Sequence, residues 1–431
     1  MKHRSDKLWT RARGTVQITT DKGGNRMSAN GFRAAGFSWR LYCGRQVLEQ
    51  SLRDAVIRAG ARRAFVICSP SITRKTDSVR RIAAALGDLH AGVFDAVEND
   101  ATYASVKAAK EAAVAAGADL LIAVGGGSVI MAARGVAIFM AEPDDPFRIM
   151  TQYPEGRPAY SPRLAAPKPP IINVPTTPNS AMNRAGTALK NPDLDHRMEY
   201  FDPKTRPHSI FLDEEALLAT PPHLIRSTAA TVFAGSVAAK SQLDSNPLVE
   251  GDDDQAFRLS WRACTRLPDE PTNPSLLIDV AVAAFLRNRA EDDGMSRLLR
   301  GRTFSGSYAV STALHIRYPR IGQGESTSVI HSTRIRLSET VDAPSAQRVA
   351  EALEVWRPGM DGREAALAVA DRLDAVYERL GMPTRVRQLD IPREDFPKIA
   401  ADTVKNFNAN AGARSPEAQI ADALQLLEAA Y

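Results

Sequence analysis

Residues 119–130 read Asp-Leu-Leu-Ile-Ala-Val-Gly-Gly-Gly-Ser-Val-Ile. A short apolar run that ends in glycines is typical of a buried parallel strand. Ser128 then opens a segment of small and apolar residues, 131–140, which predicts a helix. At the glycines between strand and helix, a ligand can approach the backbone without meeting a Cβ, and the free N–H groups and dipole of a helix N-terminus favour a diphosphate. Taken alone, the same turn could simply join a strand to a helix.

The composition and length indicate a soluble globular protein. A chain of 431 residues is long enough for two domains, and 44% apolar with 24% charged residues is ordinary for a globular protein. No apolar run reaches the ~18 residues that a membrane span needs, and no early segment resembles a signal peptide. Cys43, Cys68 and Cys264 are far apart in sequence and form no CxxC pair. We therefore expect reduced thiols, a cytoplasmic location and no membrane partner.

The basic residues are concentrated at the N-terminus. Residues 1–40 contain nine Lys or Arg and two Asp, and their net charge of +7 exceeds the net charge of +5 of the whole chain. The rest of the chain is therefore slightly acidic. We interpret residues 1–30 as a basic, poorly ordered arm, and we expect a solvated tail rather than a nucleic-acid-binding segment.

Strand-like and helix-like segments alternate from Gly44 onward. Short apolar runs predict strands, and longer runs with apolar residues at helical spacing predict helices. Besides the run that ends at Gly125, strands are predicted at 63–68, 91–97, 171–174 and 209–212, and helices at 46–58, 77–86 and 103–116. This alternation implies a parallel sheet covered by helices on both faces.

The pattern changes twice along the chain. Eight of the 27 prolines lie between Glu142 and Pro170, which excludes regular structure there and predicts a long surface excursion. After Pro222 the spacing is helical to the C-terminus. We predict a Rossmann-like α/β domain at residues 31–217, followed by an all-helical domain at 218–431.

Several motifs occur in the order found in one known family. They are Gly125-Gly126-Gly127-Ser128, Pro175-Thr176-Thr177, the run Asp202-Pro203-Lys204-Thr205-Arg206-Pro207, and Ser69-Pro70 after a strand. In these motifs the chain resembles the iron-containing (group III) alcohol dehydrogenase superfamily, and it is most similar to the maleylacetate reductase branch. The resemblance implies a dehydroquinate synthase-like fold.

The resemblance also implies an NAD(P) cofactor. The residues that match the family's cofactor-binding positions are Gly125, Gly126, Gly127, Ser128, Ser69, Pro70, Thr176, Thr177 and Arg197, the last where the family has a lysine. Ser69 and Ser71 are followed by Arg74 and Lys75, with no acidic residue before Asp77. A segment with basic residues and no nearby acidic residue can accommodate the 2′-phosphate of NADPH, so we favour NADPH slightly over NADH.

The chain departs from the metal-binding relatives. Those proteins use an Asp and a His four residues apart on the helix after the domain boundary, and the alignment puts Phe233 and Val237 there. Neither side chain can donate to a metal ion. Two further family histidines correspond approximately to His315 and His331. We therefore expect no bound metal, as the maleylacetate reductase branch is regarded as metal-independent.

Without a metal, protein groups must supply the proton for a reduction. His315 is the first candidate, with Tyr318 and His331 as second choices, although each could instead have a purely structural role. A guanidinium can hold a carboxylate through two parallel hydrogen bonds, so Arg184 or Arg334 is the candidate for binding an acidic substrate.

We therefore predict a metal-independent NAD(P)H-dependent reductase of a small, carboxylated carbonyl or enone substrate, and expect a homodimer from the resemblance. Two alternatives stay open: a non-redox lyase or cyclase on the same fold, or a catalytically degenerate nucleotide-binding protein.

Overall fold

The computed structural model describes residues 32, 34, 36–154, 159–292, 303–405 and 415–431. The chain divides into two units, Met1–Arg33 and Ala34–Tyr431. All secondary structure given below belongs to the second unit. The basic arm predicted for residues 1–30 lies outside the described residues.

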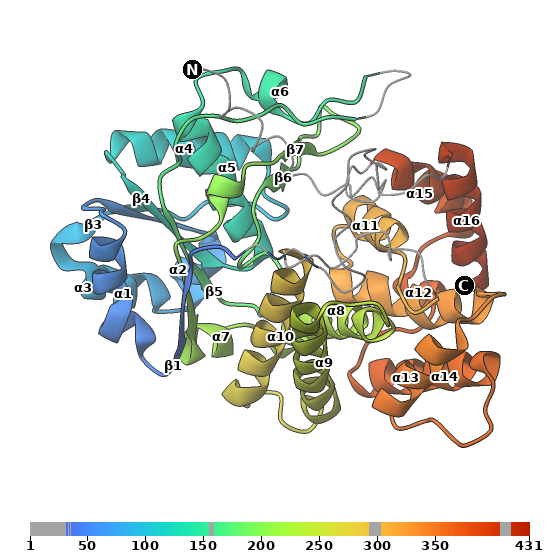
Figure 1. Cartoon of the computed structure of the whole chain (residues 1–431). Helices are drawn as coiled ribbons and strands as arrows, with labels where there is room; N and C mark the ends of the chain where they lie inside the picture. Colours follow the sequence, from blue (N-terminus) through green and yellow to red (C-terminus); the bar gives the residue numbers. More distant parts are fainter. Residues whose placement is uncertain (1–31, 33, 35, 155–158, 293–302, 406–414) are drawn as a thin grey trace, which may run out of the picture. The chain divides into compact units, whose positions relative to one another are not determined.

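A sheet of six parallel strands organises the N-terminal half of the described chain (Figure 1). The order across the sheet is β1-β8-β5-β4-β2-β3. Because the strands are parallel, their carboxyl ends lie along one edge, where ligands bind in folds of this class. The strands are β1 (Arg40–Gly44), β2 (Ala64–Cys68), β3 (His90–Phe94), β4 (Leu120–Gly125), β5 (Ile171–Pro175) and β8 (Ser209–Asp213).

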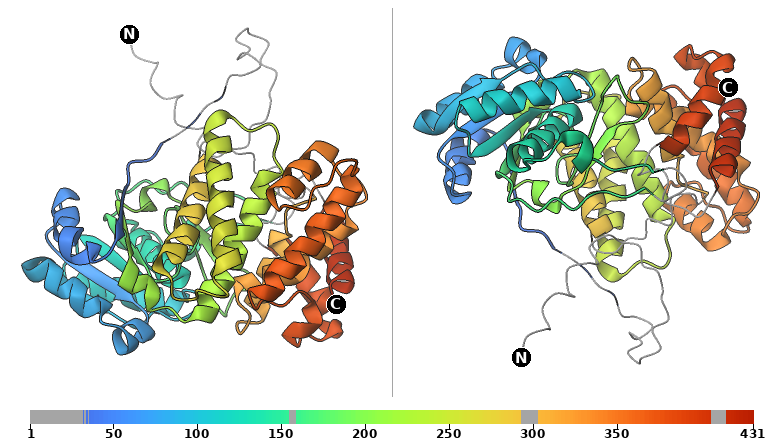
Figure 2. Two further views of the ribbon diagram at one scale, coloured as in Figure 1. Left: turned by 90° about the horizontal axis from the view of Figure 1, so that it is seen from below. Right: turned by 90° about the horizontal axis from the view of Figure 1, so that it is seen from above.

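Helices cover both faces of this sheet (Figure 2). Alternate side chains of a strand point to opposite faces. Thus Val66 of β2 packs in one apolar cluster with α1 (Val47–Arg58) and α3 (Ser78–Leu86). Its neighbours Phe65 and Ile67 belong to a second cluster with α4 (Tyr103–Ala115) and α5 (Gly127–Ala141). The predicted doubly covered parallel sheet is confirmed.

Three strands of the structure are not predicted by the sequence. β1 is an edge strand of mixed polarity whose only neighbour in the described sheet is β8. β6 (Thr187–Leu189) and β7 (Met198–Tyr200) form a small antiparallel pair outside the main sheet. Strands of three residues are too short to show a period in the sequence.

The proline-rich segment 142–170 is more ordered than predicted. It contains a short helix, α6 (Pro146–Ile149), so the expectation that it lacks regular structure is wrong there. Nζ of Lys168 is fully buried and lies 2.6 Å from Oε1 of Glu142 and 3.0 Å from Oδ2 of Asp202. These ion pairs fasten the segment to the α/β half.

After β8 the described residues form only helices and loops, in agreement with the predicted helical half. α8, α9 and α10 each begin at a proline, which has no N–H group to leave unpaired at a helix start. None of the described helices is long and apolar enough to cross a membrane. The remaining helices are α2 (Pro70–Lys75), α7 (Glu214–Leu218), α8 (Pro222–Lys240), α9 (Pro247–Arg266), α10 (Pro274–Asp292), α11 (Tyr308–Arg317), α12 (Gln323–Leu337), α13 (Ala343–Ala352), α14 (Gly362–Arg379), α15 (Phe396–Asp402) and α16 (Pro416–Ala429), with 3₁₀ turns η1 (Gly87–Leu89), η2 (Pro203–Thr205), η4 (Val386–Leu389), η5 (Arg393–Asp395) and η6 (Thr403–Lys405).

Two apolar cores support the helical half. The cluster that covers one face of the sheet continues into α8, α9, α10, α13 and α14. A separate cluster joins α11, α12, α15 and α16. α11 is therefore held from behind by other helices, which leaves its remaining face for the α/β half.

Candidate active site

The glycine turn, residues 125–128, joins β4 to α5 with little space around its first two residues. Gly125 has a φ of +155°, and a Cβ there would lie 2.7 Å from Cγ2 of Val129. A Cβ on Gly126 would lie 3.2 Å from Oγ1 of Thr177. At Gly127, by contrast, the nearest atom to an added Cβ is Oδ1 of Asn179, at 4.0 Å. The turn is tight on the protein side and open at Gly127.

The N-terminus of α5 is available to an anion. α5 begins at Gly127, and no side chain in the described part of the chain caps its first turn. The first N–H groups of a helix have no partner within the helix, and the helix dipole adds partial positive charge there. A glycine-lined helix start with open space beside it fits the pyrophosphate of a dinucleotide.

Neighbouring strand ends bring the other predicted cofactor residues to this edge. Cys68, the last residue of β2, is in register with Val124 of β4, so Ser69 and Pro70 follow beside the turn. The backbone N–H of Thr176 donates to the carbonyl oxygen of Gly125 at 3.1 Å. The structure thus brings together the segments that contain Ser69, the glycine turn, Thr176 and Thr177.

An acidic residue lies nearer to the end of β2 than the sequence suggested. Asp95 follows β3, and its Oδ2 accepts a hydrogen bond from Oγ1 of Thr73 at 2.9 Å. Thr73 belongs to α2, the helix that contains Arg74. The segment predicted to favour a 2′-phosphate therefore has a carboxylate beside its basic residues.

Asp100 connects the glycine turn to Arg197. Its backbone N–H donates to Oγ of Ser128 at 3.0 Å, and its carboxylate forms an ion pair with the guanidinium of Arg197. Asp100 and Ala101 have φ values of 70° and 51°, a left-handed conformation that costs free energy in residues with a Cβ. The sequence analysis missed Asp100, because no motif marks it.

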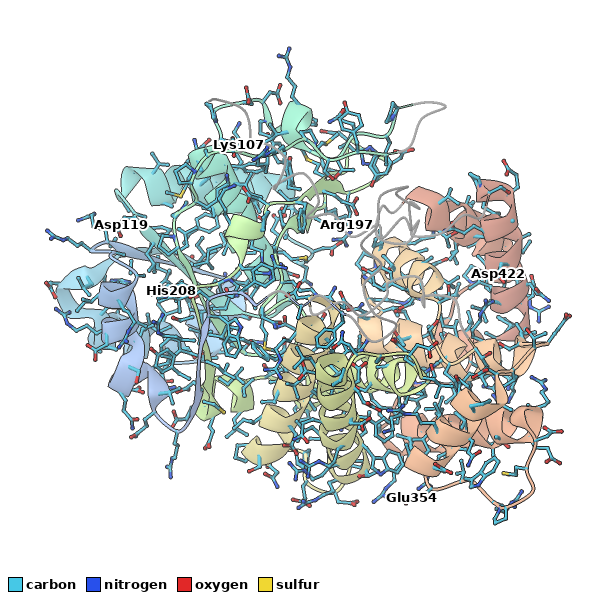
Figure 3. All side chains as sticks on the ribbon, in the orientation of Figure 1. Lys107, Asp119, Arg197, His208, Glu354 and Asp422 are labelled. Carbon is cyan, nitrogen blue, oxygen red and sulfur yellow. The ribbon has the colours of Figure 1, made fainter. Side chains whose placement is uncertain are left out.

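His315 approaches this group from α11. Burial lowers the pKa of His315, and the positive charge of Arg197 lowers it further, while Asp100 acts in the opposite direction. His315 is thus close enough to Arg197 and Asp100 for their charges to act on its ring, and Figure 3 shows Arg197 at the edge of the α/β half next to α11. Of the three predicted catalytic residues, His315 is the one with this position.

The hydrogen bond of His315 fixes its tautomer. Nδ1 lies 3.0 Å from the carbonyl oxygen of Ser311, and a carbonyl oxygen can only accept. Nδ1 therefore carries the proton in the neutral ring, and Nε2 has the lone pair. In this form Nε2 can accept a proton from an alcohol, and it can donate one only after the ring is protonated.

The guanidinium of Arg184 is bound to two side chains of α10. Its guanidinium donates to Oδ1 of Asn288 and pairs with Oε1 of Glu291 at 2.8 Å. Its side chain is still 40% exposed. It also lies close enough to Tyr308, the first residue of α11, for the two to interact electrostatically. Arg184 is thus near the start of the helix that contains His315.

The other predicted residues of the helical half point elsewhere. The ring of His331 is fully buried, with Nδ1 2.7 Å from the hydroxyl of Tyr377 and Nε2 3.0 Å from the carbonyl oxygen of Phe304. Its two ring nitrogens are both occupied, so this geometry argues against a role in proton transfer and indicates a structural one.

The side chains of Tyr318 and Arg334 are bound to carboxylates elsewhere in the helical half. The hydroxyl of Tyr318 donates to Asp395 at 2.5 Å, and burial together with this carboxylate raises the pKa of Tyr318 to about 12. Arg334 pairs with Asp422 of α16 at 2.8 Å. Neither residue is directed toward the glycine turn, which argues against their predicted roles.

The aligned pair on α8 also has a different orientation from the one expected. Phe233 is fully buried against Phe257, Trp261 and Tyr377, and Val237 is fully buried as well. These side chains belong to the helical core and do not fill a metal cage.

The partly exposed face of α8 instead contains Thr228, Thr231 and Gly235. Both threonine hydroxyls donate to carbonyl oxygens of their own helix. Among the described residues no group of three or more His, Cys, Asp or Glu side chains is placed to hold a metal ion. Phe233 and Val237 have no atom that can bind iron or zinc, so the described residues do not fit the metal of the family's name.

A cavity of about 440 Å³ lies apart from this group. It is bordered by Phe37, Trp39, Asn183, Arg206 and Phe285 among others. The rings of Trp39 and Phe285 meet edge to face at 4.5 Å. None of its described lining residues belongs to the glycine turn or to α11.

Comparison with known families matches both halves of the chain. A model described as iron-containing alcohol dehydrogenase matches residues 39–214. A second, described as the C-terminal part of the Fe-containing alcohol dehydrogenase family, matches residues 295–431. Together the two matches span more than half of the chain.

Curated relatives are distant, and the share of their length that matches this chain differs between them. The 4-hydroxybutyrate dehydrogenase of Cupriavidus necator is 26% identical over 387 residues, which cover 88% of this chain and 94% of that protein. Maleylacetate reductase 2 of Cupriavidus pinatubonensis is 27% identical over 231 residues, or 54% of this chain and 55% of that protein.

Solved structures show the same fold. An archaeal alcohol dehydrogenase from a Red Sea brine pool superimposes with a TM-score of 0.78 at 18% identity, covering 95% of this chain and 100% of that one. Maleylacetate reductase from Rhizobium gives a TM-score of 0.69 at 20% identity, covering 93% and 98%. At these identities the likeness concerns the fold alone.

Proposed function

The chain belongs to the iron-containing alcohol dehydrogenase family, and from this membership we propose that it is an NAD(P)H-dependent reductase of a small carbonyl or enone compound that carries a carboxylate. The observation that carries the proposal is the position of His315 within electrostatic range of the Arg197–Asp100 pair, which is bonded to Ser128 of the glycine turn. A proton-transferring group is thus next to the place that fits a pyrophosphate.

Each residue of this group has a distinct task in the proposed reaction. The amides at the start of α5 would hold the pyrophosphate of a dinucleotide, and Asp100 keeps Ser128 and Arg197 in place. A dinucleotide held there would supply the hydride for the carbonyl carbon. As the C=O π pair moves onto oxygen, that oxygen takes a proton from Nε2 of the protonated His315 ring.

The protonation state of His315 should determine how the rates of oxidation and reduction depend on pH. Since burial and Arg197 hold the pKa of His315 below its ordinary value near 6.5, the ring is mainly neutral at pH 7. Neutral His315 is the base for alcohol oxidation. Protonated His315 is the acid for carbonyl reduction, so reduction should speed up as the pH falls.

We propose that no metal takes part, because the aligned metal positions on α8 are Phe233 and Val237, which have no donor atom and are buried in the helical core. A hydrogen-bond donor of the protein can stabilise developing negative charge on a substrate oxygen without a Lewis acid.

Arg184 is the proposed site for the substrate carboxylate. Its side chain is 40% exposed and interacts electrostatically with Tyr308. His315 lies seven positions after Tyr308 in α11, a rise of roughly 10 Å. A short oxo acid, with the additional reach of the arginine, spans such a distance. Relatives named for 4-hydroxybutyrate and maleylacetate support an acidic substrate, whereas relatives named for 1,3-propanediol and lactaldehyde do not.

The test is a steady-state assay of the purified protein with NADH and NADPH. We expect oxidation of one of them with 4-oxobutanoate or maleylacetate, and a kcat/KM at least about tenfold lower with the neutral lactaldehyde, for want of the carboxylate contact. Both dinucleotides are compared, because Arg74 and Asp95 act in opposite directions on a 2′-phosphate. Binding of a nucleotide without turnover of any carbonyl compound would favour the lyase or the degenerate binding protein instead.

A further inference from the structure

One face of α11 packs against the helical core. Val310, Ala313 and Leu314 belong to the apolar cluster that α11 forms with α12, α15 and α16. Oγ of Ser311 lies 2.9 Å from Oγ of Ser326 and 3.0 Å from Oγ1 of Thr327, both on α12. These contacts define the back of the helix.

The opposite face contains Tyr308, Thr312 and His315. Their spacing of four and three residues places them in one row along a helix. Both ends of the row lie within electrostatic range of an arginine of the α/β half: Tyr308 of Arg184, and His315 of Arg197. Thr312 lies between them on the same face of the helix.

Thr312 is unusual among the hydroxyls of this region. Its side chain is buried, with 6% of the residue exposed, and Oγ1 has no hydrogen-bond partner among the described residues. The buried hydroxyls of Ser311, Ser326 and Ser328 all have partners. A buried hydroxyl without a partner destabilises a fold, and such groups call for an explanation. A ligand that is present during the reaction supplies one.

We propose that the Thr312 hydroxyl donates a hydrogen bond to the substrate carbonyl oxygen that His315 protonates, and so takes the charge-stabilising place of a metal ion. This inference rests on the proposed function. Thr312 is one helical turn before His315, so one oxygen atom can contact both side chains. As hydride reaches the carbonyl carbon, negative charge grows on that oxygen, and a donor fixed there stabilises the transition state more than the ground state.

Two substitutions separate this role from a structural one. Thr312→Val keeps the shape and removes the hydroxyl, and Thr312→Ser keeps the hydroxyl. With NADPH and 4-oxobutanoate we expect kcat/KM to fall about 10²-fold in Thr312→Val and to stay within about threefold of the wild type in Thr312→Ser. The Kd of NADPH should be the same in all three proteins. The Tm of Thr312→Val should equal or exceed that of the wild type, because an unpaired buried hydroxyl is lost.

Thr403→Val is the matched control. Thr403 is also buried, but its hydroxyl donates to the carbonyl oxygen of Ala400 at 2.7 Å, on the back side of the helical half. Its kcat/KM should not change. Full activity in Thr312→Val, or a loss of activity that parallels a lower Tm, overturns the proposal.

Failure of the proposed function can be told apart from failure of this inference. If the wild type binds NADPH but reduces neither 4-oxobutanoate nor maleylacetate, the proposed function falls. Binding of 4-hydroxybutyrate to the NADPH complex then decides the role of Thr312. About five- to tenfold weaker binding in Thr312→Val supports the contact, and equal binding overturns it.

Discussion

Replacing Gly127 with alanine should weaken dinucleotide binding without weakening the fold. Among the described residues the added Cβ has no neighbour closer than Oδ1 of Asn179 at 4.0 Å, so none of them opposes it. Alanine also favours the helical state over glycine by up to about 1 kcal/mol. The open space at Gly127 is where a pyrophosphate would approach the amides of α5. A methyl group there should cost one charge-assisted hydrogen bond, about 1.5–3 kcal/mol, which raises Kd roughly 10- to 150-fold.

Gly125→Ala provides the contrasting variant. Its Cβ would lie 2.7 Å from Cγ2 of Val129, at a φ of +155°. Backbone strain of about 1–3 kcal/mol and overpacking of about 1–3 kcal/mol should lower the free energy of unfolding. Binding and stability should therefore fall together in this variant, and separately in Gly127→Ala.

The assay is a fluorescence titration with NADH and with NADPH, paired with urea unfolding of each variant. If Gly127→Ala is as stable as the wild type and binds both dinucleotides equally well, the pyrophosphate does not contact this turn, and the reasoning is refuted.

Further predictions follow from the same geometry. His315→Ala should lower kcat for reduction by about 10²-fold or more, whereas alanine at the exposed His223 should have no effect; an unchanged rate in His315→Ala removes it as proton donor. Above the lowered pKa of His315, kcat/KM for reduction should fall about tenfold per pH unit while that for oxidation stays level, because only the protonated ring donates; a level profile for reduction between pH 7 and 9 contradicts this assignment. Elemental analysis should find far less than one iron or zinc per chain, and stoichiometric metal together with metal-dependent activity would contradict metal independence. Deletion of residues 1–30 should leave Tm unchanged, since β1 begins at Arg40, and a lower Tm would show that the arm supports the fold.

The fold was predictable where burial leaves a strong pattern in the sequence. β4 is fully buried, so it reads as a continuous apolar run that stops at Gly125. β1 lies at the edge with exposed residues at both its start and its fourth position, and β6 has only three residues. Such strands are specified by their neighbours rather than by their own sequence.

The site was predictable only in part, because the sequence does not show which way a helical side chain points. The aligned pair Phe233 and Val237 shares a face of α8, but that face is the one turned to the core. His315 and His331 are the same residue type, so the sequence does not distinguish them. Only the three-dimensional structure separates the buried ring of His331 from that of His315, on which the charge of Arg197 acts.

Asp100 and Thr312 had no signal at all in the sequence. Asp100 matters because the loop after β3 crosses the start of α5, where its N–H group reaches Ser128. Thr312 matters because its hydroxyl is buried without a partner. Both properties arise from tertiary packing, which a single sequence does not display.

The most direct measurement is a crystal structure of the wild-type protein grown with NADPH. Pyrophosphate oxygens within hydrogen-bonding distance of the N–H groups at residues 126–128, with the nicotinamide ring beside His315 and Thr312, are the predicted result. A nucleotide bound elsewhere, or a metal ion ligated by His315, would contradict it.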